Sequence, residues 1–291
     1  MNYAFFVGCK TPHHVPAYEK STRAVCAAVG LGLVDLEFNC CGYPMRNLYF
    51  DSYILSAARN MAIAEARGLD VMTQCKCCLG SFKTAAYYMK EDPALLARIN
   101  DELAKEGLRY SGKVVVKHLL TALSRDVGAE ALAQRITRPF IGLKAAVLHG
   151  CHALRPSQMT GFDDPWHPTL SDELVALTGA EVVEWAGKVS CCGAPLRGRN
   201  DALADRMIGQ RLNEAHRAGA DVFCVSCPYS FMQASGAYRA AAGGGEALVA
   251  AAALYPQMLG LAMGLTPEEL GVADGPALGR HLVEHLANKA A

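Results

Sequence analysis

The cysteines of this chain repeat in order and in spacing. Ten of the 12 cysteines fall into two sets of five, each made of a single cysteine, an adjacent pair and a Cys-x-x-Cys. The first set is Cys9, Cys40, Cys41, Cys75 and Cys78. The second set is Cys151, Cys191, Cys192, Cys224 and Cys227. Chance is a poor explanation for one order occurring twice, so the sequence predicts a tandem duplication.

The residues beside the cysteines repeat as well. Segment 40–46, Cys-Cys-Gly-Tyr-Pro-Met-Arg, matches segment 191–197, Cys-Cys-Gly-Ala-Pro-Leu-Arg, at five of seven positions. In both sets a Ser-Phe pair follows the Cys-x-x-Cys after two further residues. This alignment makes Cys75 equivalent to Cys224, and Cys78 equivalent to Cys227.

Short apolar runs alternate with helical stretches, which is typical of α/β proteins with parallel sheets. The predicted strands are Tyr3–Val7, Leu33–Leu36, Val71–Gln74, Ala145–His149, Glu181–Trp185 and Val222–Ser226. The predicted helices are Val15–Val29, Asp51–Arg67 and Asp201–Ala218. Gly68 and Gly219 suit the ends of the last two helices. We therefore expect two tandem pseudo-symmetric domains, each a small parallel sheet with flanking helices.

The domain boundary is predicted near the glycines and proline of 126–143, which gives domains of residues 1–141 and 142–291. A helical C-terminal tail should follow the second sheet. The uncharged stretch Ala247–Leu265 reads as a buried helix, although its length would also span a bilayer. Thr266 and Pro267 form a good helix start. The glycine run 243–245 reads as a turn and lacks a dinucleotide-binding pattern.

Five clustered thiols favour a polynuclear metal centre. Structural zinc takes four ligands, commonly in paired C-x-x-C units, whereas each set here has one such unit and an adjacent pair. Adjacent cysteines reach two metal atoms of a cluster more readily than one small tetrahedral ion, and thiolates usually hold iron–sulfur clusters. Gly42 and Gly193 would let the backbone aim N–H groups at cluster sulfurs. The alternatives are a zinc-bearing structural protein and pairs of cysteines that are simply buried apolar residues.

The charge and the N-terminal sequence indicate which partners and which cell compartment to expect. The formal net charge is zero, so no basic excess points to nucleic acid, and we expect no nucleic-acid partner. The first residues lack the pattern of a secretory signal peptide, and clustered cysteines in a reducing compartment bind metal more often than they form disulfides. We expect a cytoplasmic protein without a transmembrane segment.

A lone cysteine, a Cys-Cys-Gly and a Cys-x-x-Cys, occurring twice, resemble the CCG domain pair in the B subunit of heterodisulfide reductase. Segment 150–156, Gly-Cys-His-Ala-Leu-Arg-Pro, segment 161–165, Gly-Phe-Asp-Asp-Pro, and the tail segment 259–265 are similar to that family too. The chain departs from it where the family often has Pro before Gly8, and in the extra Cys77. These departures indicate a subfamily with another substrate.

The resemblance implies two noncubane 4Fe-4S clusters, one on each set of five cysteines, that face one another across the domain interface. A disulfide would be cleaved or formed between them, with Cys41, Cys192 and His152 as the candidate catalytic residues. The resemblance also implies a ferredoxin-like iron–sulfur subunit and a flavin subunit as partners. The alternatives are a bacterial sulfur-oxidising complex acting on a thiol or persulfide of a carrier protein, and a pure electron-transfer subunit of a quinone-linked dehydrogenase.

Further residues are candidates on chemical grounds. Basic side chains near the cysteines would bind an anionic thiol, namely Lys10, His13, His14, Arg46, Lys76, His152, Arg155, Arg197 and Arg199. Each of them is otherwise a solvated surface charge. His149 and His152 flank Cys151 and are candidates for hydrogen bonds to sulfur or for proton transfer. Cys26 is predicted to be a core residue, and Cys77 is a candidate reactive thiol beside Lys76.

Overall fold

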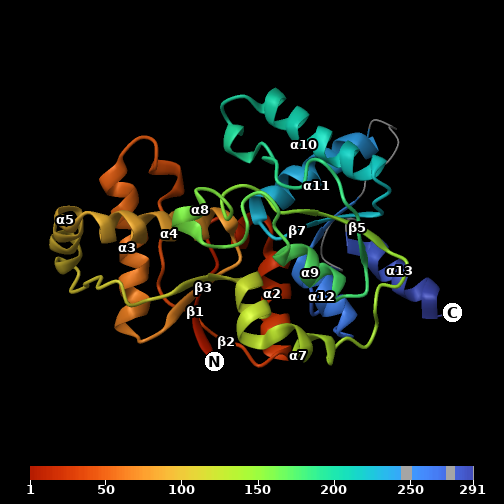
Figure 1. The fold of residues 1–291 in the computed structure, drawn as a ribbon, viewed down its shortest axis with the longest axis horizontal. Coiled ribbons are helices and arrows are strands. Elements are labelled where there is room, and N and C mark those ends of the chain that lie inside the picture. The colour runs from red at the N-terminus through yellow and green to blue at the C-terminus, as the bar shows by residue number, and fades with distance from the viewer. Residues whose placement is uncertain (244–250, 273–278, 291) are drawn as a thin grey trace.

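The computed structural model describes residues 1–243, 251–272 and 279–290, and its described part contains two four-stranded sheets covered by helices (Figure 1). The strand order is β2-β1-β3-β4 in the first sheet and β6-β5-β7-β8 in the second. Every strand pair is parallel. The predicted α/β fold of two pseudo-symmetric halves, each with one parallel sheet, is therefore confirmed.

The elements follow one order in both halves. The first half contains β1 (Asn2–Phe6), α1 (Thr11–His14), α2 (Pro16–Ala28), β2 (Gly32–Val34), η1 (Tyr43–Met45), α3 (Phe50–Ala66), β3 (Asp70–Thr73), α4 (Lys76–Glu91), α5 (Pro93–Ala104), β4 (Val116–His118), α6 (Leu119–Thr121), the π-helical η2 (Ala122–Gly128) and α7 (Ala129–Ala133). The second half contains β5 (Lys144–Leu148), α8 (Ser157–Thr160), α9 (Leu170–Ala176), β6 (Glu181–Val182), η3 (Ala194–Leu196), α10 (Asp201–Arg217), β7 (Val222–Val225), α11 (Pro228–Gly243), β8 (Ala251–Leu254), α12 (Tyr255–Ala262) and α13 (Arg280–Ala290).

Local sequence explains these elements. The central strands are buried from Tyr3 to Phe6 in β1 and from Val222 to Val225 in β7, as parallel strands covered on both faces must be. Helix α10 begins where the Asn200 side chain accepts a 3.0 Å hydrogen bond from the Leu203 amide. Gly68 and Gly219 follow the ends of α3 and α10 with positive φ, as predicted for helix C-terminal caps.

Two strands were not predicted, because each looks helical or too short in sequence. Strand β4 has only three residues, Val116-Lys117-His118. Strand β8 consists of Ala251-Ala252-Ala253-Leu254, and alanine favours helix. Pairing with β7 on a fully buried edge overrides that preference. The predicted helix Ala247–Leu265 is thus wrong as a single helix: its described part is β8 followed by α12.

The C-terminal region differs from the prediction in detail. Thr266 and Glu269 exchange the hydrogen bonds of a capping box, but the chain makes only one turn there. Of the glycine run 243–245, Gly243 ends α11 and the other two lie outside the described residues. Within the described part of the chain, no helix has both the length and the apolar character needed to cross a membrane.

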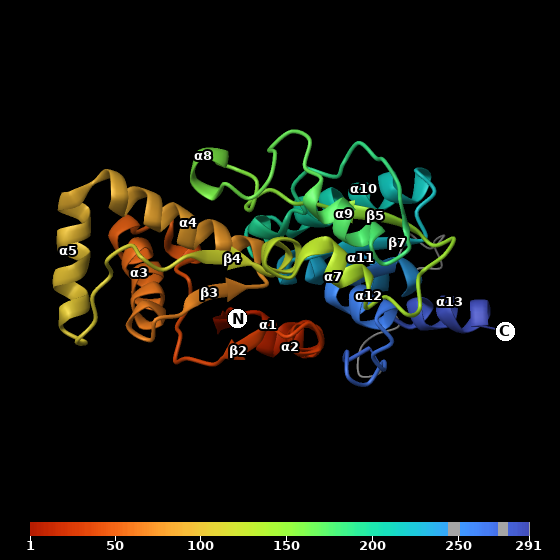
Figure 2. The ribbon, with the colours of Figure 1, turned by 60° about the horizontal axis from the view of Figure 1, so that its bottom comes forward.

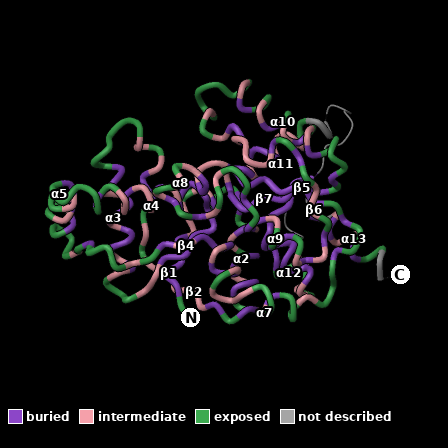
Figure 3. Tube along the Cα trace, in the orientation of Figure 1, coloured by how far each residue is buried: buried purple, intermediate pink, exposed green. Residues whose placement is uncertain are grey.

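The two halves pack closely on one another. Helix α2 of the first half contacts α12 of the second, and α8 of the second half contacts α4 of the first (Figure 2). Buried segments run along the strands and continue where the halves meet (Figure 3). One cluster of buried side chains includes Phe5 and Met72 together with Leu174 and Met258. The boundary at residue 141 remains a prediction, since the halves share this core.

Candidate metal centre at the seam

The cysteines gather beyond the carboxyl ends of the central strands, where ligand sites of parallel sheets form. Cys9 follows β1, Cys75 follows β3, Cys151 follows β5 and Cys227 follows β7. The adjacent pairs precede the short helices η1 and η3. The structure therefore brings cysteines from distant parts of the sequence to one place.

The first set forms a compact group. Its five cysteines line one hollow, together with Cys77 of the same half and Tyr229 of the other half. The Sγ atoms of Cys9 and Cys40 lie 4.0 Å apart, and Cys78 lies beside Cys41. Cys41, Cys75 and Cys78 are buried, whereas Cys9 is exposed. This group contains every member that the sequence assigned to the first set.

The second group contains four of its five predicted members. Cys151, Cys191, Cys192 and Cys227 line a cavity of about 780 Å³ between the two halves. The hydroxyl of Ser230 hydrogen-bonds to the sulfur of Cys192 and also faces this cavity. Cys224 is separate from these residues.

Cys224 lies inside strand β7. It pairs with Val147 and Ala253 in neighbouring strands, and its side chain is fully buried. Side chains alternate between the two faces of a strand, and that of Cys224 belongs to the apolar core shared by the halves. Burial raises the pKa of its thiol to about 12. Among the described residues, Cys224 is not part of the lining of either sulfur group.

The sequence alignment of the third block is therefore wrong by three residues. Strands β3 and β7 have four residues each, and α4 and α11 each begin after two intervening residues. Register confirms this, because Ala4 pairs with Val71 and Ala146 pairs with Phe223. Cys75 is thus equivalent to Cys227, and Cys78 is equivalent to Ser230. The ligand prediction for Cys224 loses the equivalence on which it rested.

A signal for the correct register was present in the sequence. Pro228 follows Cys227, and proline favours the first position of a helix. Helix α11 begins at Pro228, as α4 begins at Lys76. The repeated Ser-Phe pair favoured the other alignment, but Phe82 is fully buried and Phe231 only partly, so these residues are not equivalent.

The glycines after the adjacent pairs have the predicted geometry. Gly42 and Gly193 both have φ of 80°, which favours glycine. The Gly193 amide donates to Cys191 Sγ at 3.4 Å, and the Gly42 amide donates to Cys40. A Cβ atom on Gly42 would lie 2.7 Å from the carbonyl oxygen of Tyr53. Each adjacent pair is therefore followed by the same kind of glycine turn, whose amide donates a hydrogen bond to the first cysteine of the pair.

The thiol groups stabilise one another as thiolates. A hydrogen bond from the thiol of Cys41 lowers the pKa of Cys40 to about 2, and one from Cys151 lowers the pKa of Cys191 to about 2. The Cys227 thiol, donating to Cys75, holds the pKa of Cys75 well below its ordinary value. Soft thiolates grouped in this way suit iron–sulfur clusters. The donor set of the described residues thus fits such a group.

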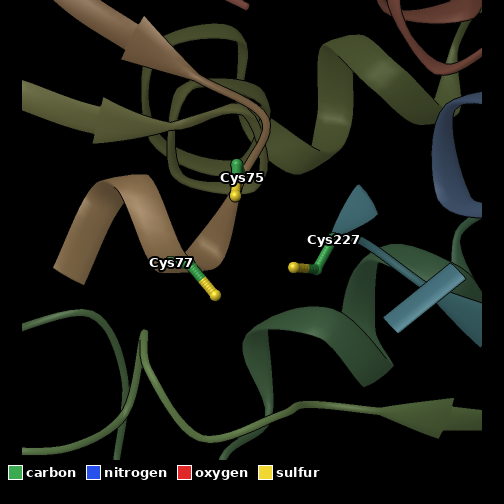
Figure 4. A group of neighbouring side chains, drawn as sticks. All are labelled: Cys75, Cys77 and Cys227. Carbon is green, nitrogen blue, oxygen red and sulfur yellow. The ribbon is translucent and has the colours of Figure 1, made fainter. Parts of the chain in front are cut away.

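Three sulfur atoms meet where the groups adjoin. The Sγ atoms of Cys75, Cys77 and Cys227 all lie within 4.8 Å of one another, and Figure 4 shows them converging from the two halves. These three cysteines are buried. The two sulfur groups therefore adjoin at this seam, as the sequence analysis expected of the two sets.

His152 joins the halves through its ring nitrogens. Nδ1 lies 3.2 Å from Cys77 Sγ, and Nε2 lies 3.0 Å from the Tyr43 hydroxyl and 3.2 Å from Arg46. Burial lowers the pKa of His152. His149 instead contacts Asp172 at 2.7 Å, inside the second half. Of the two predicted histidines, only His152 lines the cavity at the seam.

The cavity at the seam carries positive charge. The Lys and Arg residues in its lining are Lys10, Arg46, Lys76, Arg197 and Arg199, and no Asp or Glu is among the described residues that line it. Lys76 is buried, and burial lowers its pKa to about 8. The remaining basic candidates lie elsewhere: Arg155 at a neighbouring opening, His14 between α2 and α11, and His13 on the exposed end of α1. Cys26 is a buried core residue, as predicted.

Known proteins resemble this chain along most of its length. A family model for the cysteine-rich CCG domain matches residues 3–83 and 145–233. The chain is 33% identical to the B subunit of the ferredoxin/F(420)H(2)-dependent CoB-CoM heterodisulfide reductase of Methanosarcina acetivorans, over 92% of this chain and 91% of that protein. It is 31% identical to a protein of Archaeoglobus profundus that is described as like the heterodisulfide reductase B subunit, over 93% of each.

One further relative in sequence and one solved structure are similar to this chain. The 8-methylmenaquinol:fumarate reductase membrane anchor subunit of Wolinella succinogenes is 32% identical, over 95% of this chain and 99% of that protein. The crystal structure of a hypothetical protein from Helicobacter pylori superposes with a TM-score of 0.73 at 17% identity and covers 94% of this chain. This chain spans about half, 51%, of that structure's chain, and the likeness shows the fold alone.

Proposed function

The chain belongs to the family of cysteine-rich CCG-domain proteins that includes the B subunit of heterodisulfide reductase, and from this we propose that it is the catalytic iron–sulfur subunit of a heterodisulfide-reductase-like complex. In this role it cleaves or forms a disulfide at the seam between its halves. The observation that carries the proposal is the meeting of two thiol groups, with the sulfur atoms of Cys75 and Cys227 within 4.8 Å of one another.

The proposed cofactors are two noncubane 4Fe-4S clusters. The first would be held by Cys9, Cys40, Cys41, Cys75 and Cys78, and the second by Cys151, Cys191, Cys192 and Cys227. When bound, they supply single electrons and iron sites for thiolates, whereas a disulfide takes up two electrons and two protons to give two thiols. Two centres beside one S–S bond match that requirement. Their electrons come from the partner subunits.

The residues of the chain itself bind and orient the substrate. Arg46 and Lys76 come from the first half and Arg199 from the second, so an anionic group is attracted from both sides of the cavity. The guanidinium of Arg197, which also lines the cavity, is already bonded to Asp205 and Gln233. His152 lines the cavity at the seam, and its Nδ1 is placed to donate a hydrogen bond to the sulfur of Cys77, because its Nε2 accepts from Arg46. Cys41 and Cys192 follow Cys40 and Cys191 at equivalent positions, one in each half, and are the cysteines proposed to take part in the reaction. The substrate class is therefore a disulfide or thiol that bears carboxylate, sulfonate or phosphate groups.

The same proposal specifies the partner subunits and the cell compartment. A ferredoxin-like iron–sulfur subunit and a flavin subunit would carry electrons to or from this chain in the cytoplasm. The direction of flow depends on the substrate, and a sulfur-oxidising complex would run the reaction toward disulfide or persulfide on a carrier protein.

The proposal is tested on anaerobically purified protein. Iron and acid-labile sulfide are measured first, and electron paramagnetic resonance spectra are then recorded under oxidising conditions with and without an anionic thiol. A thiol-induced signal that disappears in both Cys41→Ala and Cys192→Ala supports disulfide chemistry. Unchanged thiol-dependent turnover in both variants, or a metal content of zinc alone, contradicts it.

A second function is favoured by one comparison. The Wolinella succinogenes relative, a subunit of a fumarate reductase, matches nearly its full length. An electron-transfer subunit would use the two centres in series without binding a thiol. Such a protein would show redox-active iron signals that are insensitive to added thiols, and the spectra described above separate the two functions.

A further inference from the structure

The two sulfur groups are unequal once the halves are aligned by their strands. In the first half, Cys75 and Cys78 precede and enter helix α4, and both belong to the group. In the second half, the equivalent positions are Cys227 and Ser230. The second group therefore has a hydroxyl where the first has its fifth sulfur. Cys224 does not supply the missing sulfur, because it lies inside β7 and is not among the described residues that line either sulfur group.

The first half carries one sulfur that its own group does not need. Cys77 and Cys78 are neighbours on α4, and consecutive helical residues point in different directions. Cys78 is turned toward Cys41 and Gly8, with its Sγ 3.4 Å from the place of a Cβ on Gly8. Cys77 is turned toward the second half, where its sulfur meets Cys227 and His152 Nδ1 (Figure 4). It also lines the cavity that holds Cys151, Cys191 and Cys192.

From this arrangement we infer that Cys77 is the fifth sulfur ligand of the second metal centre, donated across the seam by the first half. The inference rests on the proposed iron–sulfur chemistry and extends it. It makes the second centre dependent on both halves, since four of its ligands come from one half and one from the other. The equivalent residue in the second half is Tyr229, which faces the first hollow but offers no thiol. Only one of the two centres is therefore shared.

The test measures iron and acid-labile sulfide per full-length chain after anaerobic purification. A background with Cys9→Ser and Cys41→Ser disables the first centre, so that the remaining iron belongs to the second. In that background Cys77→Ala should lose the remaining iron, and in the otherwise unchanged chain it should lose about half of the iron. Cys224→Ala and Cys26→Ala are the matched controls, because both cysteines are fully buried and neither lines the hollow of the first group or the cavity at the seam. Both variants should retain the iron of their parent chains.

A rescue variant separates ligation from packing. Adding Ser230→Cys to Cys77→Ala supplies a sulfur at the position equivalent to Cys78, and it should restore the lost iron and its Mössbauer spectrum. The inference is overturned if Cys77→Ala keeps its iron, if Cys224→Ala loses it, or if Ser230→Cys does not restore it. An unmodified chain that binds no iron contradicts the proposed function itself, which is a different result from an iron-loaded chain indifferent to Cys77.

Discussion

The ammonium nitrogen of Lys76 lies 2.7 Å from the carbonyl oxygen of His149, so a buried cation of the first half is bonded to the end of a strand in the second. Lys76 opens helix α4 between Cys75 and Cys77, and His149 follows β5 shortly before Cys151. The same side chain also reaches the Leu148 carbonyl at 3.5 Å. One lysine thus joins the halves and places positive charge beside both sulfur groups.

Replacing this lysine tests both roles. Lys76→Met keeps the length of the side chain but loses its hydrogen bonds and charge, and should lower the free energy of unfolding by about 1–3 kcal/mol. The loss of a nearby cation should also make the reduction potentials of the metal centres more negative. Urea denaturation and a redox titration followed by paramagnetic resonance measure these effects. Lys105→Met, which removes an exposed ion pair with Glu102, should change neither quantity much.

The turns that hold the adjacent cysteines should not tolerate a side chain. Gly42→Ala and Gly193→Ala each combine a positive φ with a Cβ placed within 3 Å of a carbonyl oxygen, 2.7 Å from Tyr53 and 2.8 Å from Ala204 respectively. Each should destabilise the protein by about 1–3 kcal/mol and reduce the iron content of its own centre. Thermal unfolding and iron analysis check this, and equal iron in variant and parent would contradict it.

A third glycine provides the control for that prediction. Gly209 lies within α10, and a Cβ there would meet no atom within 4 Å. Gly209→Ala should therefore stabilise the helix by about 0.5–1 kcal/mol and leave the iron unchanged.

Substrate recognition is predicted to depend on Arg46. Its guanidinium carbon lies 4.4 Å from the centre of the Tyr43 ring, and Nη1 contacts His152, so the side chain is held at the cavity. Arg46→Gln should weaken the binding of an anionic thiol by about tenfold to a hundredfold, since a charged hydrogen bond contributes about 1.5–3 kcal/mol. Titration of the thiol-induced paramagnetic signal gives the dissociation constant. Arg98→Gln, on an exposed ion pair with Asp51, serves as the control.

The charge of the ligand provides a second comparison for Arg46. A neutral thiol lacks the group that the guanidinium would bind, so its affinity should be the same for Arg46→Gln and the parent chain. If the variant weakens anionic and neutral thiols equally, Arg46 acts on the shape of the cavity, and the proposed substrate class loses this support.

The sequence predicted the parts of the fold in which local pattern and tertiary environment agree. Helices α2 and α10 and strands β1 and β5 lie where apolar periodicity and turn residues placed them. Strand β8 was missed because its alanines favour a helix when read alone, and only the buried edge of β7 makes them a strand. Nothing in the sequence of residues 251–254 itself indicates that β7 lies beside them.

The sequence predicted most of the cysteines that form the candidate site. It did not predict the alignment of β7 with β3, which decides which cysteines of the second half face the site. Cysteine spacing identified both groups, yet it equated Cys224 with Cys75 because a Cys-x-x-Cys occurs in each half. The side of a strand on which a residue lies depends on register, and a shift of three residues exchanges a site residue for a core residue. Cys77 was likewise only one candidate thiol in the sequence, and its contact with Cys227 depends on how the halves dock.

The buried His118 should make stability depend on pH. It closes β4, its Nδ1 accepts a hydrogen bond from the Leu120 amide at 3.2 Å, and burial lowers its pKa to about 3. Between that value and the ordinary value near 6.5, the unfolded chain binds the proton and the folded chain does not. Stability from this group is therefore present above about pH 6.5 and is lost as the pH falls, by at most about 1.4 kcal/mol per unit.

A variant isolates the contribution of His118 from those of other buried histidines. His118→Asn keeps a side-chain acceptor before α6 but removes the titrating ring. Urea denaturation at pH 5.5 and 7.5 should show a smaller loss of stability on acidification in the variant than in the parent chain. His216→Asn, on the exposed end of α10, should leave the parent's pH dependence intact. Equal pH slopes for His118→Asn and the parent would mean that the His118 ring is protonated in the folded protein, against the expectation from its burial.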